Sequence, residues 1–127
     1  MTAQVISTPK APQAVGPYSQ AIMGNGLVFV SGQIPIDPGT GVIVEGTIAQ
    51  QTERILSNIT SILQAANASL SNVLKTTVYL TNMQDFEEMN QAYSQIFGTH
   101  RPARSTVEVS RLPKGAKLEI EAIALVK

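Results

Sequence analysis

The sequence predicts an α+β fold in which one mixed sheet of six strands carries two helices on one face. Two stretches with apolar residues three and four positions apart predict the helices, and six short, mostly apolar runs predict the strands. Their order is three strands, a helix, a strand, a helix and two strands, so each helix joins strands that are expected to run parallel through a right-handed crossover. The sheet face without helices would be a large apolar patch, and such patches usually indicate association between subunits.

The first three strands are predicted near the N-terminus. Residues 4–7 form a short apolar-rich run, and three prolines keep residues 8–17 irregular because proline donates no hydrogen bond to a sheet. Residues 20–23 and 27–31 follow as two strands, and the Gly-Asn-Gly turn between them predicts a β-hairpin.

The two helices are predicted over residues 47–68 and 84–97, with a strand over residues 73–80 between them. Thr47 can cap the first helix, and Gln50 completes a capping box. The apolar stripe of this helix comprises Ile48, Thr52, Ile55, Leu56, Ile59, Ile62, Leu63 and Ala66. The second helix is expected to begin after the cap Asn82, to end at Gly98, and to bury Phe86, Met89, Tyr93, Ile96 and Phe97.

The last two strands are predicted within residues 101–109 and 112–123, and they carry charged residues among apolar ones. Because strand side chains alternate between faces, Glu119 and Glu121 should share one face. The opposite face then carries Leu118, Ile120 and Ala122. Two carboxylates on one strand face repel each other unless water or a cation relieves them.

Arg104 and Arg111 are the arginines nearest to these carboxylates in the sequence. A guanidinium paired with a carboxylate beside apolar residues could orient a small acid and transfer a proton near it, which makes this segment a candidate site. The alternative is an ordinary exposed strand face with alternating charges. Ion pairs with perturbed pKa values occur at functional sites, but they also occur in purely structural networks.

Composition restricts the classes of function. The chain of 127 residues is expected to form a single domain, 1–127. Nine basic and nine acidic residues give no net charge, which disfavours nucleic acids and anionic membranes as partners. With no cysteine and one histidine, His100, the chain lacks the ligands of zinc–sulfur or multi-histidine metal sites. No segment has the features of a signal peptide or a membrane span, so a cytoplasmic protein is expected, with mitochondrial import of a longer precursor left open.

Two glycine-containing segments near strand ends are further candidates for a binding site. In residues 31–33 (Ser-Gly-Gln), Gly32 would let the backbone approach a ligand, and adjacent N–H groups could bind a carboxylate. In residues 16–19 (Gly-Pro-Tyr-Ser), a rigid turn would aim Tyr18 at a pocket. The alternatives are a plain strand exit and a tyrosine packed in the core, and neither segment is specific by itself.

Four segments together carry a family likeness. They are residues 16–21 (GPYSQA), 31–35 (SGQIP), 102–105 (PARS) and 118–121 (LEIE). With these segments in this order, the chain resembles the RidA/YjgF family, also called the reactive intermediate deaminase family. The resemblance implies a homotrimer of chorismate-mutase-like subunits whose sheets pack around the threefold axis as a barrel, with three sites in the clefts between neighbours.

The same resemblance implies hydrolysis of reactive enamine and imine acids, such as 2-aminoacrylate and 2-iminobutanoate, to 2-oxo acids and ammonia, without a metal or organic cofactor. Arg104 would hold the substrate carboxylate through a bidentate contact that lysine could not reproduce. Glu119 would be the acid/base that positions or activates water. The residues implied to line the pocket are Tyr18, Ser31, Gly32, Asn90 and Thr106.

Three of these assignments leave alternatives open. Asn90 lies in the predicted second helix, and the alternative to a role in the pocket is that it is an ordinary polar residue exposed on that helix. Many relatives carry cysteine at the position of Thr106, so threonine suffices there only if the role is shape and a weak hydrogen bond. Glu121 is assigned to structure or to the rim of the site, although it could exchange roles with Glu119.

Other functions compete with deamination. The main one is a non-enzymatic module that binds a 2-oxo acid or similar carboxylate at Arg104 and regulates a partner. A nuclease or translation inhibitor is disfavoured by the absence of net positive charge and of a histidine pair. A chaperone-like protein that uses exposed apolar surface is the remaining possibility.

Overall fold

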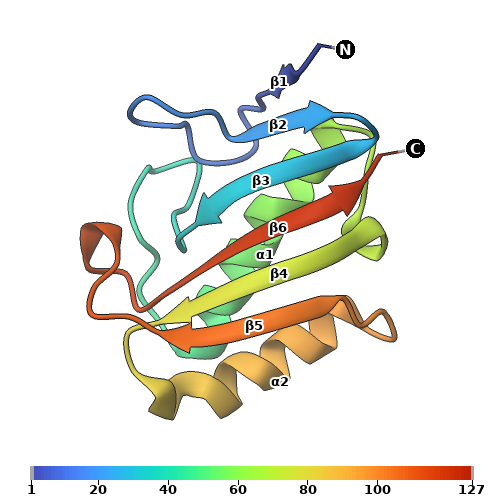
Figure 1. Ribbon diagram of the computed structural model, residues 1–127. Coiled ribbons are helices and arrows are strands. Elements are labelled where there is room, and N and C mark those ends of the chain that lie inside the picture. Colours follow the sequence, from blue (N-terminus) through green and yellow to red (C-terminus); the bar gives the residue numbers. More distant parts are fainter. Residues whose placement is uncertain (1, 127) are drawn as a thin grey trace.

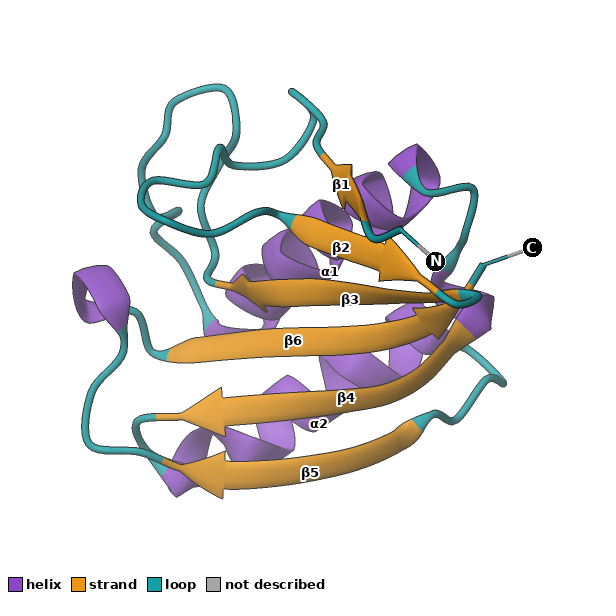
Figure 2. Cartoon of the chain, turned by 45° about the horizontal axis from the view of Figure 1, so that its top comes forward, coloured by secondary structure: helices purple, strands orange, loops and turns teal. Residues whose placement is uncertain are grey.

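A computed structural model describes residues 2–126 and contains a six-stranded sheet with both helices packed on one face (Figures 1 and 2). The strands are β1 (Gln4–Ile6), β2 (Ala21–Gly24), β3 (Leu27–Gln33), β4 (Val73–Leu80), β5 (Ala103–Glu108) and β6 (Leu118–Leu125). Their order across the sheet is β1-β2-β3-β6-β4-β5, and only β4 and β5 pair in parallel. Since β3 and β4 are both antiparallel to β6, they run parallel to each other, as predicted for strands joined by a helix.

The helix α1 (Ile48–Ala65) begins at the predicted capping box. The Thr47 hydroxyl accepts the Gln50 N–H at 3.1 Å, and the Gln50 side chain accepts the Thr47 N–H at 2.9 Å. The predicted stripe is buried against the sheet. The helix ends three residues earlier than predicted because Asn67 adopts a left-handed conformation (φ 59°) and the Ala68 N–H bonds back to the Leu63 carbonyl.

The helix α2 (Phe86–Phe97) begins later than predicted. A 3₁₀ turn (Met83–Asp85) precedes it, and Asn82 caps that turn by accepting the Gln84 N–H at 2.9 Å, so the assignment of Asn82 as the cap of the α-helix is wrong. Such turns are common at the first turn of a helix. The predicted end at Gly98 is confirmed by its left-handed φ of 67°.

The hairpin between β2 and β3 and the start of β6 show how local turns set the strand ends. Asn25 and Gly26 both have positive φ (54° and 79°), which is the geometry that a two-residue hairpin requires. The expectation of a strand from residue 112 is wrong, because Pro113–Gly115 forms a 3₁₀ turn with Lys114 and Gly115 at φ 57° and 70°. The strand β6 therefore begins at Leu118.

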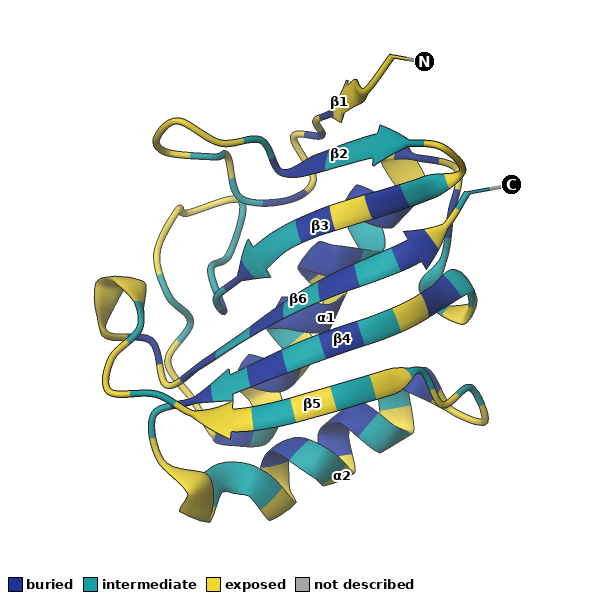
Figure 3. Ribbon diagram, in the orientation of Figure 1, coloured by how far each residue is buried: buried dark blue, intermediate teal, exposed yellow. Residues whose placement is uncertain are grey.

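The core lies between the sheet and the two helices. Along β6, Leu118, Ile120, Ala122 and Ala124 are buried toward the helices, and Figure 3 shows the resulting alternation on β4 and β6. The opposite face exposes Phe29 (47%), Val107 (41%) and Leu125 (47%). Polar residues on the same face are Lys75, Thr77, Tyr79, Glu119 and Glu121. The uncovered face is therefore mixed rather than uniformly apolar. Within residues 2–126 no helix is both long enough and apolar enough to span a bilayer.

Candidate active site in two halves

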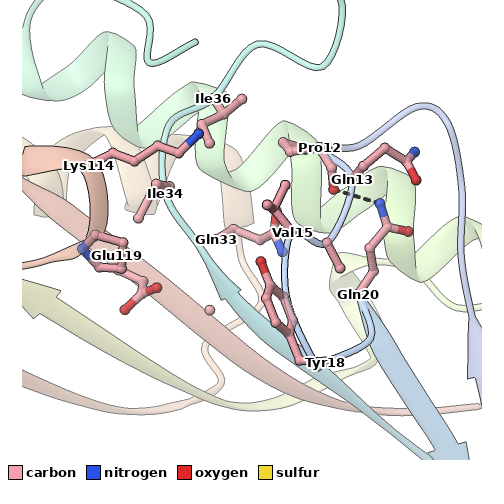
Figure 4. A pocket seen from close by; sticks show the side chains of 13 residues that line it. Pro12, Gln13, Val15, Tyr18, Gln20, Gln33, Ile34, Ile36, Lys114 and Glu119 are labelled. Carbon is pink, nitrogen blue, oxygen red and sulfur yellow. Dashed lines mark hydrogen bonds between the residues drawn. The ribbon is translucent and has the colours of Figure 1, made fainter. Parts of the chain in front are cut away.

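A cavity of about 290 Å³ lies beside Glu119, between the start of β6, the end of β3 and the N-terminal loop. Tyr18 and Glu119 lie on opposite sides of this cavity, and Lys114 extends over it toward Ile36 (Figure 4). Its wall also contains Gly32 and several apolar residues. We call this region the carboxylate half of the site, after Glu119.

Gly32 allows Glu119 to occupy its position. The pairing of β3 with β6 shifts register between Val30 and Gln33, as at a β-bulge, and Gly32 lies in the shifted segment. A Cβ atom on Gly32 would lie 2.7 Å from both Cδ and Oε2 of Glu119. The carboxylate therefore rests against the backbone where any other residue would displace it.

The surroundings of Glu119 raise the pKa of its carboxyl group. Burial is the larger cause, because it disfavours the charged form, and the neighbouring carboxylate of Glu121 adds to the effect. A carboxyl group that keeps its proton more readily than in water suits transfer of a proton to and from a bound substrate.

Ser31 holds the loop that carries Tyr18 and does not line the cavity. Its hydroxyl donates to the Ser19 carbonyl at 2.6 Å, and its N–H donates to the Gln20 carbonyl at 2.9 Å. The buried Gln20 side chain fixes the same loop from the other side, since its amide donates to the Pro12 carbonyl at 2.8 Å. Tyr18 is thereby presented at the cavity although it is 55% exposed.

Arg104 lies in a second hollow, of about 390 Å³, between the start of β5 and α2. Its NH1 group donates to Oδ1 of Asn90 at 2.8 Å. The guanidinium carbon lies 5.5 Å from the ring centre of Phe86 and 4.8 Å from that of Tyr93, within cation–π range. Tyr93 is itself fixed by a 2.7 Å hydrogen bond to Thr76. We call this region the arginine half of the site.

Thr106 lies on the same side of β5 as Arg104 but lines neither half. It pairs with Val78, which faces the helices, and its hydroxyl oxygen is buried without a hydrogen-bond partner among residues 2–126. The contact of Thr106 with a ligand therefore stays a prediction.

Arg104 and Glu119 lie on opposite faces of the sheet, so the expected pairing of a guanidinium with a carboxylate does not form within one chain. Arg104 pairs with Thr76, whose side chain is buried toward α2. Glu119 pairs with Tyr79 on the face without helices. Three positions separate Thr76 from Tyr79 along β4, and strand alternation places side chains an odd number apart on opposite faces.

The structure also adds residues that the sequence analysis did not single out. Lys114 lines the carboxylate half, and Arg101 and Tyr93 line the arginine half. Arg101 could have been noticed as a second arginine three positions before Arg104. Lys114 had no such signal, because its orientation depends on the 3₁₀ turn. Among residues 2–126 no group of three or more histidine or acidic side chains is arranged to hold a metal ion.

Comparisons with known proteins agree along nearly the whole chain. The endoribonuclease L-PSP family pattern matches residues 8–126. The chain is 56% identical over 124 residues to a RutC family protein of Pyrococcus abyssi, with 98% of each protein covered. It is 46% identical over 122 residues to the human 2-iminobutanoate/2-iminopropanoate deaminase, covering 96% of this chain and 89% of the human protein.

The fold agrees with these matches. The crystal structure of the YjgF gene product of E. coli superposes with a TM-score of 0.93 at 41% identity, covering 98% of this chain and 99% of that one. The six-stranded mixed sheet with two helices is thereby confirmed, as is the resemblance that the four sequence segments indicated. The chain belongs to the RidA/YjgF/L-PSP family, whose members include RutC proteins.

Proposed function

We propose that this protein hydrolyses reactive enamine and imine acids, such as 2-aminoacrylate and 2-iminobutanoate, to 2-oxo acids and ammonia. The human relative that bears the name of this activity is similar over nearly the full length of both chains. The arginine half provides a cation for the substrate carboxylate, and the carboxylate half provides a group that can exchange a proton.

The separation of the two halves is the observation that carries the assembly we propose. Arg104 and Glu119 act on one substrate only if the arginine half of one subunit meets the carboxylate half of a neighbour. An interface that joins two different surfaces in this way is heterologous and closes into a ring when the rotation permits. Three subunits with their sheets around a threefold axis, as the family resemblance implies, would form three such sites.

Arg104 is suited to bind the carboxylate of the substrate. Two aromatic rings and Asn90 hold its guanidinium in place, so little freedom is lost when a ligand binds. Its remaining N–H groups can form the paired hydrogen bonds that a carboxylate accepts. Fixing the substrate at this end places its C=N carbon at a defined distance from the neighbouring Glu119.

The chemical step needs water and proton transfer. Water attacks the carbon of the protonated imine while Glu119 takes one proton from that water, which forms a carbinolamine. Glu119 returns this proton to the nitrogen, and the C–N bond breaks to release ammonia. Glu119 then takes the hydroxyl proton as the carbonyl of the 2-oxo acid forms, and later loses it to solvent. The imine carbon is already electrophilic, so orientation and one proton relay lower the barrier without a covalent intermediate. A thiol cannot take part because the chain has no cysteine.

The other predicted site residues have supporting roles in this proposal. Tyr18 forms one wall of the cavity, and the backbone of Gly32 lies against Glu119. Ser31 holds the loop of Tyr18, and Asn90 orients Arg104. For Thr106 we propose only that its hydroxyl, which has no partner among residues 2–126, forms a hydrogen bond with the substrate or with a neighbouring subunit.

The first experiment couples a threonine dehydratase to this protein and measures release of 2-oxobutanoate, with semicarbazide competing for the imine. We expect acceleration by the wild type and a loss of about 10²-fold or more in Arg104→Ala, since the substrate would no longer be oriented. Arg111→Ala, which removes an exposed arginine outside both halves, should behave as wild type. Full activity in Arg104→Ala with an unchanged oligomer would refute the assignment.

The alternative of a carboxylate-binding regulatory module predicts a different result. Neither wild type nor Glu119→Gln would then turn over the imine, while both would bind a 2-oxo acid with the same affinity. The nuclease activity suggested by the family description has no support in the site, because the single histidine, His100, contacts the Val73 carbonyl at 2.7 Å and packs beside Phe97.

A further inference from the structure

Among residues 2–126, the lining of the arginine half contains two guanidinium groups and no carboxylate. Its hollow is lined by Asn90, Tyr93, Ser94, Arg101, Pro102 and Arg104. Arg101 is not needed for the proposed function, in which Arg104 alone holds the substrate carboxylate. A second cation without a carboxylate partner among residues 2–126 leaves positive charge in this hollow that an anionic ligand can take up.

Both guanidinium groups retain free hydrogen-bond donors. Arginine has five N–H donors. Among residues 2–126, Arg104 uses only NH1, for its contact with Asn90. Arg101 also uses only NH1, which donates to the Gly98 and His100 carbonyls. The Nε and NH2 groups of both arginines thus remain available to a ligand.

The backbone holds Arg101 beside this hollow without neutralising its charge. Its carbonyl partners lie at and just beyond the end of α2, where the negative end of the helix dipole favours a cation. Pro102 restricts the backbone directly after Arg101. Arg101 lies three positions before Arg104, just ahead of β5, so their Cα atoms are at most roughly 11 Å apart. The two cations are therefore suited to two separate anionic groups on one short ligand.

We propose that this protein binds 2-oxo and 2-imino acids that carry a second carboxylate in the side chain, with Arg104 on the first carboxylate and Arg101 on the second. This inference rests on the proposed function for the role of Arg104. A dicarboxylic acid fits better than a phosphate group, because the two guanidinium groups have separate anchors, Arg101 at the Gly98 carbonyl and Arg104 at Asn90. Each is thus held at its own place, which suits two carboxylates more than one compact anion. Arg101 is then a specificity-determining residue of the site.

The test is calorimetric binding of three probes to the assembled full-length protein: 2-oxoglutarate, 2-oxobutanoate and inorganic phosphate. We expect 2-oxoglutarate to bind about tenfold more tightly than 2-oxobutanoate, since one additional charge-assisted contact is formed. The preference should disappear in Arg101→Ala, persist in Arg111→Ala, and shrink as salt is added. Arg101→Gln, which can still donate to the Gly98 carbonyl without a charge, should also lose the preference and serves if the alanine variant does not fold.

The outcomes separate this inference from the proposed function. Equal affinity for the two oxo acids, or a preference that survives in Arg101→Gln, would overturn the role of Arg101 and leave the deaminase proposal intact. Tighter binding of phosphate than of 2-oxoglutarate would overturn the dicarboxylic ligand class. Binding of 2-oxobutanoate that is unchanged in Arg104→Ala would contradict the proposed function itself.

Discussion

Glu119 and Glu121 are two positions apart on one strand face, and their surroundings differ. Glu119 lines the cavity with Tyr18 and rests against Gly32. Glu121 lies in a separate hollow on the face without helices, beside Phe29 and Lys75. This difference favours Glu119 as the acid/base. Glu121 then affects the pKa of Glu119 through its charge.

The effect of Glu121 on Glu119 is testable through the pH dependence of activity. The Glu121 carboxylate raises the pKa of Glu119, so Glu121→Gln should lower that pKa toward its ordinary value, although burial still raises it. The limb of the kcat/KM profile that reports Glu119 should therefore move to lower pH. Glu53→Gln, at an exposed position of α1, should leave the profile unchanged. An unmoved limb in Glu121→Gln would show that the limb reports another group.

Asn90 gives a second prediction for a single residue. Its side-chain oxygen accepts one N–H of the Arg104 guanidinium. Hydrogen bonds to charged groups contribute about 1.5–3 kcal/mol, so Asn90→Ala should lower kcat/KM about tenfold or more by loosening Arg104. The neighbouring Gln91→Ala, at an exposed position, should have little effect. If Asn90→Ala kept wild-type kinetics, Asn90 would be an ordinary polar residue of the helix surface with no role in orienting Arg104.

At the scale of elements, the approach of β3 to β6 positions Glu119, the proposed acid/base. The register shift before Gln33 brings the Gly32 backbone to Glu119, while Gln33 itself returns to the buried face opposite Ile120. The same two strands thus supply both core packing and one half of the site.

Gly32→Ala should separate activity from stability. Its Cβ would displace the flexible Glu119 side chain and leave the backbone pairing in place, so we expect a wild-type Tm within a few degrees and a loss of about 10²-fold in kcat/KM. Gly24→Ala is the matched control, because the nearest atom to a Cβ there is 4.0 Å away. Equal activity of the two variants would mean that the position of Glu119 is not critical.

At the scale of the whole molecule, two half-sites on opposite faces of the sheet predict complementation between inactive subunits. Arg104→Ala and Glu119→Gln should each be inactive alone. A randomly reassembled equal mixture should recover about one quarter of wild-type activity, because that fraction of heterologous interfaces joins an intact arginine half to an intact carboxylate half.

Two controls complete this experiment. Mixing without subunit exchange should restore nothing, and the assembled mass should correspond to three chains by light scattering. Recovery of no activity after verified exchange would place both groups of one site in the same subunit.

Much of the fold could be predicted from the chain. The capping box of Thr47 and Gln50, the Asn-Gly turn and the alternation along residues 118–124 are local patterns, and local backbone geometry determines their outcome. The predicted starts of α2 and β6 were wrong because a 3₁₀ turn forms directly before each element. Such turns change where a helix or strand begins, but they do not change whether it forms.

The sequence by itself determined the strands and helices and the buried stripes, because periodicity and turn chemistry act over a few positions. Only the tertiary structure decided that Arg104 faces α2 while Glu119 faces away from the helices. That outcome depends on the insertion of β6 between β3 and β4 and on the register of three strands distant in sequence. Pairing between distant strands sets which side chains share a face, and no local pattern contains that information.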